Sequence, residues 1–184
     1  MVVVAAAGAS AWAGERNVTV CMNSGSVRQV AHSAQAIASR IFAGIEVGIE
    51  WRNGSCPSSP ETIKVSLSDR TPKTHIPNAL AHAFPYEGTT IVIFYDRIQQ
   101  GVEKARVGHL LAYVLVHEIT HILQGVARHS TSGIMKARWD SGDYFEMQCK
   151  RLDFTSLDVE LIYLGLKTRA SRLTVSEPVL VASR

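Results

Sequence analysis

The sequence contains no long run of lysine and arginine, and no stretch of the roughly 18 apolar residues that a membrane-spanning helix needs. Charged residues make up only 19% of its 184 residues, and the formal net charge is +3. So mild a charge gives little support for a nucleic-acid partner. The length and the 46% hydrophobic content are those of one globular domain with its own core. We expect a monomer that binds no nucleic acid and, after removal of any signal peptide, no membrane.

Cysteine is also scarce, with only Cys21, Cys56 and Cys149. No two of them have the C-x-x-C spacing that is typical of a cysteine zinc site. Cys21 lies in the apolar run 18–22, which predicts a buried strand residue. Three pairings are possible, and we expect Cys56 and Cys149 to be the disulfide-bonded pair.

The first thirteen residues carry no charge and are rich in valine and alanine. They end in Ala11-Trp12-Ala13, the small-x-small pattern that precedes a signal-peptidase cut. We interpret 1–13 as a signal peptide, which predicts a secreted or periplasmic protein; the alternative is a buried or disordered N-terminal strand. The main domain would then be 14–169, and 170–184 a C-terminal tail without a clear pattern.

Hydrophobic periodicity predicts a mixture of strands and helices. The expected strands are 18–22, 45–51, 63–67 and 89–95, with a short edge strand at 80–85 that its proline limits. The expected helices are 27–42, 102–125 and 157–166, the last capped by Thr155 or Ser156. The segment 126–144 reads as irregular. This order fits an α+β domain in which two long helices cover a mixed sheet.

The helix at 102–125 carries the motif His117-Glu118-x-x-His121. Residues four apart lie on the same helix face, so the two imidazoles can hold one metal ion. Glu118 directly follows the first ligand and can act as general base and acid toward the attacking water. Because the rest of this helix is apolar, burying these three side chains without a partner would be costly. The motif therefore predicts one catalytic Zn²⁺ ion, against the alternative of incidental helix histidines.

A catalytic zinc site needs a third protein ligand. His129 lies eight residues after His121, and Gly125 stands between them, where a helix can end in a left-handed turn. The chain could then return and present His129 to the same metal. An acidic third ligand from a later element is the alternative, and the candidates are Glu146, Glu160 and, less favoured, Asp140.

Residues 117–121, Gly125, His129 and the segment 132–135 together resemble the metzincin metallopeptidases. The resemblance implies three histidine ligands, a glycine turn between the second and third, and a methionine turn formed here by Met135. In this chain the glycine and third histidine follow the second histidine by four and eight residues, against three and six in the family pattern. The chain therefore resembles a divergent metzincin-like branch.

The segment 80–85 resembles the edge strand of matrixins, which lies along the active-site cleft. By this resemblance Leu80, Ala81 and Ala83 would pair with an extended peptide through their backbone groups. His82 is expected to be structural or exposed, and 133–139 would form part of the specificity-pocket wall. The resemblance implies a zincin-like fold with an active-site helix, a twisted mixed sheet and a C-terminal helix. It implies that 14–169 is the catalytic domain of a zinc endopeptidase, or else a silent metal-containing peptide-binding domain of the same fold.

Overall fold

The computed structural model describes residues 16–57, 59–72, 77–86, 89–149 and 151–176. The predicted signal peptide at 1–13 lies outside these residues. Within the described part of the chain, no helix combines the length and the apolar character that crossing a bilayer requires.

One five-stranded mixed sheet forms the framework, as the sequence predicts. Its strands lie in the order β2-β1-β3-β5-β4, and β4 alone runs antiparallel to its neighbour β5. Since β4 is an edge strand, one of its two sides faces no other strand of the sheet. The bounds are β1 Asn17–Asn23, β2 Gly48–Asn53, β3 Ile63–Ser68, β4 Ala81–Ala83 and β5 Thr90–Phe94.

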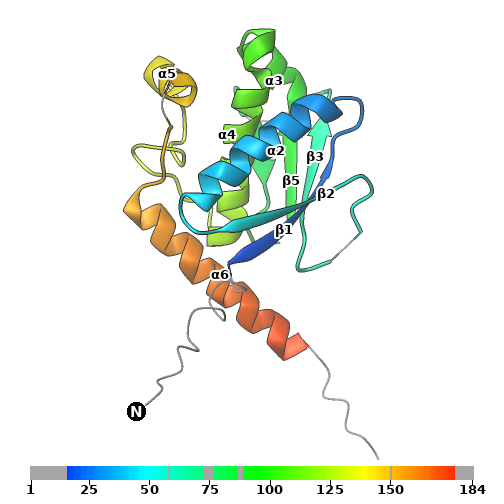
Figure 1. Cartoon of the computed structure of the whole chain (residues 1–184), viewed down its shortest axis with the longest axis vertical. Helices are drawn as coiled ribbons and strands as arrows, with labels where there is room; N and C mark the ends of the chain where they lie inside the picture. The colour runs from blue at the N-terminus through cyan, green and yellow to red at the C-terminus, as the bar shows by residue number, and fades with distance from the viewer. Residues whose placement is uncertain (1–15, 58, 73–76, 87–88, 150, 177–184) are drawn as a thin grey trace, which may run out of the picture.

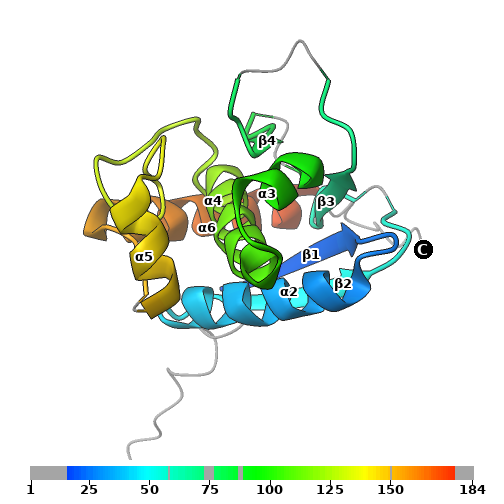
Figure 2. The same cartoon turned by 90° about the horizontal axis from the view of Figure 1, so that it is seen from above.

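Two long helices pack against each other and against the sheet (Figure 1). They are α2, Arg28–Ala43, and α4, Val107–Gln124. Every residue of α4 from Leu110 to Gln124 is buried, because α2 and the sheet cover one side and α6, Ser156–Ser176, packs on another. A helix that is apolar on nearly all faces needs such cover, and the sequence predicts it. Figure 2 shows α2 along one side of α4 and α6 passing behind it.

Three helical segments differ from the prediction. The expected helix at 102–125 begins later than predicted, because Val102 is extended and the short 3-10 helix η1, Lys104–Arg106, precedes α4. Helix α3, Tyr95–Gly101, comes before this segment and was not predicted. Helix α5, Ser141–Cys149, lies partly in the segment expected to be irregular, and its weak amphipathic pattern explains why periodicity missed it. Helix α6 continues through 170–176, so the first part of the predicted tail is helical.

The predicted Cys56–Cys149 pair is wrong. Cys21 bonds Cys56, with their Cα atoms 5.6 Å apart, and Cys149 is free and exposed at the end of α5. Cys21 is buried in β1 as expected, but burial in a strand does not prevent pairing. Strands β1 and β2 are parallel neighbours, so β1 ends beside the loop that follows β2 and carries Cys56.

Candidate metal centre

The structure brings His117 and His121 together on α4. Both are buried, and their Nε2 atoms lie 3.1 Å apart. The Nδ1 atom of His117 lies 2.8 Å from the carbonyl oxygen of Ile134, and that of His121 lies 3.1 Å from the carbonyl oxygen of Val126. A carbonyl only accepts hydrogen bonds, so each Nδ1 must carry the proton. Each neutral ring therefore has an unprotonated Nε2, and the two lone pairs face each other.

Burial keeps these imidazoles neutral. It lowers the pKa of His117 to about 3, with a further contribution from His121, and it lowers the pKa of His121 to about 4. Burial and the nearby Arg128 also lower the pKa of His129. Neutral imidazole is the form that ligates metals. Because these pKa values are low, protons do not compete with a metal ion for the ring nitrogens at neutral pH.

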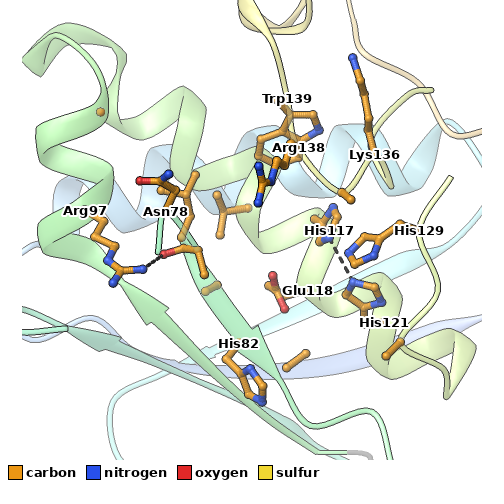
Figure 3. A pocket seen from close by; sticks show the side chains of 18 of the residues that line it. Asn78, His82, Arg97, His117, Glu118, His121, His129, Lys136, Arg138 and Trp139 are labelled. Atoms are coloured by element: carbon orange, nitrogen blue, oxygen red, sulfur yellow. Dashed lines mark hydrogen bonds between the residues drawn. The ribbon is translucent and has the colours of Figure 1, made fainter. Parts of the chain in front are cut away.

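His129 completes a group of three. The His117, His121 and His129 nitrogens all lie within 4.8 Å of one another (Figure 3). Helix α4 ends at Gly125, whose φ of 67° is left-handed and whose N–H bonds the His121 carbonyl. This turn sends the chain back past the helix, so the glycine has the conformation that the sequence predicts.

The donor set fits a divalent cation of the zinc type. Two acceptor nitrogens 3.1 Å apart repel each other unless a positive charge lies between them. Nitrogens bound at 2.0–2.1 Å in a tetrahedral zinc site are roughly 3.3 Å apart, which is close to this spacing. The second nitrogen of each helix histidine bonds a backbone carbonyl, the support that metal-binding imidazoles usually have. Among the described residues, the three histidines are the group that converges in this way.

The acidic alternatives to His129 lie elsewhere. Glu146 on α5 and Glu160 on α6 are exposed, and neither lines the cleft at the histidines. Asp140 forms an ion pair with Lys136. The geometry thus favours His129 as the third ligand over any of the three.

Glu118 is buried beside the histidine group (Figure 3). Burial raises its pKa to about 8, although the backbone amide of Ala83 donates a hydrogen bond to the carboxylate and opposes this rise. Without a nearby cation, Glu118 is therefore mostly protonated at neutral pH. A divalent cation at the three histidines would favour the ionised carboxylate.

The edge strand β4 lies along the same cleft, which has a volume of about 1000 Å³. The Leu80 carbonyl accepts from Phe94 and the Phe84 amide donates to Thr90, so these groups point toward β5. Backbone groups alternate in an antiparallel ladder, so those of Ala81 and Ala83 point toward the cleft instead. Of the predicted substrate-binding residues, Leu80 lines the cleft but directs its carbonyl away from it. His82 is exposed, with its ring against Phe84.

The segment after His129 forms the wall of the cleft that faces β4. Met135 is fully buried in the core, and its carbonyl accepts from the Ser130 amide, which closes a compact loop. Arg138 and Trp139 line the cleft, and the Trp139 indole N–H donates to the Ile134 carbonyl. That same carbonyl orients His117, so the wall and the first histidine share one backbone group.

Sequence reasoning missed Asp158, which is fully buried and bonds both neighbours of His129, Arg128 and Ser130. A sequence signal existed, because Thr155 and Asp158 have the spacing of a helix capping box. That spacing indicates a helix start but not a contact with a distant loop.

A mixed sheet with an antiparallel edge strand beside a histidine-bearing helix defines a zincin-like fold. No protein-family model and no curated protein matches this sequence. Among solved structures, the chain is similar to the crystal structure of archaemetzincin from Methanopyrus kandleri. The TM-score is 0.56 at 12% sequence identity, over 83% of this chain and 97% of that one. At this identity the likeness supports a zincin-like fold and does not identify the reaction.

Proposed function

We propose that this chain is a zinc-dependent endopeptidase that hydrolyses peptide bonds in extended substrates. The observation that carries the proposal is the convergence of two Nε2 lone pairs and His129 at a cleft that also holds Glu118. Burial of a carboxylate is costly unless it is paired, so the place of Glu118 beside the histidines favours a chemical role. The archaemetzincin neighbour, by its fold, is consistent with this assignment.

His117, His121 and His129 would hold one Zn²⁺ ion and leave a fourth position open toward the cleft. Zinc bound there would make water more acidic and polarise the substrate carbonyl. The Val126 and Ile134 carbonyls hold the two helix imidazoles in the tautomer that presents Nε2. The protein therefore supplies a preformed three-nitrogen site.

Glu118 is the proposed general base and acid. Once ionised, it takes the proton of the attacking water and delivers that proton to the leaving amine. The Ala83 amide holds the carboxylate from the β4 side. The base is thereby fixed between the histidines and the strand that borders the cleft.

The substrate would lie along β4 as an added strand. Ala81 and the Ala83 carbonyl have the outward orientation that pairing with a peptide backbone needs. Strand addition binds main chain rather than one side chain, so it suits extended peptides or unfolded segments. Arg138 and Trp139 on the facing wall would then contact substrate side chains.

The test compares wild type, Glu118→Gln and the matched control Glu146→Gln on a peptide library, with zinc content measured for each. We expect all three to hold one zinc ion, and Glu118→Gln to lose roughly 10²–10⁴-fold in cleavage rate. Glu146→Gln, an exposed acid, should cleave like wild type. Equal cleavage by wild type and Glu118→Gln would end the catalytic claim. Zinc binding without cleavage of any peptide would indicate the silent peptide-binding domain instead.

We also propose that the protein acts outside the cytoplasm, as a monomer. The Cys21–Cys56 disulfide supports export, because such bonds persist in oxidising compartments. N-terminal sequencing of protein recovered outside the cytoplasm tests the predicted cleavage after Ala13. An intact Met1 on that material would contradict the cleavage.

A further inference from the structure

The loop that carries His129 is tied down on both sides of that residue by one buried carboxylate. The Asp158 Oδ1 atom accepts from Arg128 Nη1 at 2.8 Å and from the Ser130 hydroxyl at 2.6 Å. Arg128 also donates to Ser130 Oγ at 3.2 Å. His129 itself is exposed, so its position depends on what holds its neighbours.

The other carboxylate oxygen of Asp158 fixes the start of α6. Asp158 Oδ2 accepts from the Thr155 amide at 3.0 Å and from its hydroxyl at 2.7 Å, while the Asp158 amide donates to Thr155 Oγ1 at 3.2 Å. These bonds form a reciprocal capping box. Asp158 therefore uses one oxygen for its own helix and the other for the histidine loop.

Further bonds make this connection rigid. Gln124 at the end of α4 donates to the Asp158 backbone carbonyl, and the Ile134 amide donates to the Asp153 carbonyl. Hydrogen bonds to a charged group are shorter and stronger than neutral ones, and all four donors to the Asp158 carboxylate are in place. Four donors outweigh the effect of burial and hold the pKa of Asp158 below its usual range, so the group is ionised at neutral pH.

We infer that Asp158 is the residue that positions His129 for the metal, by clamping Arg128 and Ser130 to the N-terminus of α6. The inference rests on the proposed metal site. The loop between His121 and His129 is two residues longer than the metzincin pattern, and a longer loop has more conformations to restrict. Asp158 supplies that restriction without touching the metal.

The test measures zinc affinity in the full chain by competition with a chelator, and the visible spectrum of the Co²⁺-substituted protein. Asp158→Asn should weaken zinc binding roughly 10–100-fold, the usual effect of removing a partner that orients a ligand. Its Co²⁺ spectrum should shift toward that of His129→Ala. In a His129→Ala background, Asp158→Asn should change zinc affinity no further than about threefold, because the residue acts through His129.

Thr155→Val is the matched control, since it removes the two capping-box bonds of the Thr155 hydroxyl and leaves the loop bonds. It should lower stability but keep zinc affinity within about threefold of wild type. If Asp158→Asn does not fold, Ser130→Ala removes the two hydrogen bonds of the Ser130 hydroxyl, to Asp158 and from Arg128, and keeps the Arg128–Asp158 ion pair. It should still weaken zinc binding several-fold.

Three outcomes would overturn the inference. Unchanged affinity in Asp158→Asn or Ser130→Ala, with wild type binding zinc, refutes the positioning role alone. If Asp158→Asn loses as much zinc affinity in the His129→Ala background as in wild type, Asp158 has a general structural effect and does not act through His129. Wild type that binds no zinc refutes the metal site, and with it this inference.

Discussion

Replacement of Gly165 by alanine tests how closely α6 packs on the helix that carries the metal ligands. A Cβ atom at 165 would lie 1.7 Å from the Leu123 carbonyl oxygen and 2.8 Å from its carbon. Both are backbone atoms of α4, so no side-chain rotation relieves the overlap. Ordinary contact begins at 3.4 Å, so the helices must separate by more than 1 Å.

The expected cost follows from two opposing effects. Alanine is favoured over glycine within a helix by about 1 kcal/mol. Forcing extra volume into packed backbone typically costs about 1–3 kcal/mol, and this overlap is at the severe end. We expect Gly165→Ala to lower the free energy of unfolding by about 2 kcal/mol. For a chain of this length that corresponds to a fall in Tm of roughly 4–8 °C.

Gly108→Ala is the matched control, since Gly108 also lies within a helix and a Cβ there would meet nothing closer than 3.8 Å. The free energy of unfolding of Gly108→Ala should rise by about 0.5–1 kcal/mol. Urea unfolding of both variants, with a chelator present to exclude metal effects, measures the difference. Wild-type stability in Gly165→Ala would refute the close helix contact, and destabilisation of Gly108→Ala would refute the reasoning from Cβ clearance.

Three further predictions follow from the site and the disulfide. His129→Ala should weaken zinc retention by at least about tenfold while Glu146→Ala leaves it unchanged, measured by chelator competition; the reverse result would favour an acidic third ligand. The folded pKa of Asp158 is below its unfolded value near 3.9, so its contribution is complete above that pH and is lost as pH falls through the folded pKa. The free energy of unfolding should thus fall more steeply below about pH 4 in wild type than in Asp158→Asn, and parallel curves would contradict this. Cys56→Ser should cost up to about 4 kcal/mol by loop-closure entropy, whereas Cys149→Ser should change urea unfolding little.

Local sequence patterns were enough to predict the features that depend on residues close together in the chain. The apolar periodicity around His117 and His121 predicted a buried helix, and a four-residue spacing places both rings on one face in any α-helix. Gly125 ends that helix in the predicted left-handed turn, because only glycine adopts this conformation at no steric cost. Strands β1, β3 and β5 were predicted within a few residues of their observed bounds, from an apolar run, an alternating pattern and β-branched residues in turn.

What the sequence left open involves groups far apart in the chain. The partner of Cys21 depended on which strands are neighbours, and the proximity of His129 depended on where the loop after Gly125 returns. The contact of Asp158 with Arg128 joins residues 30 positions apart. Local periodicity does not give such distances, since the pairing of β1 with β2 and the packing of α6 on α4 bring these groups together.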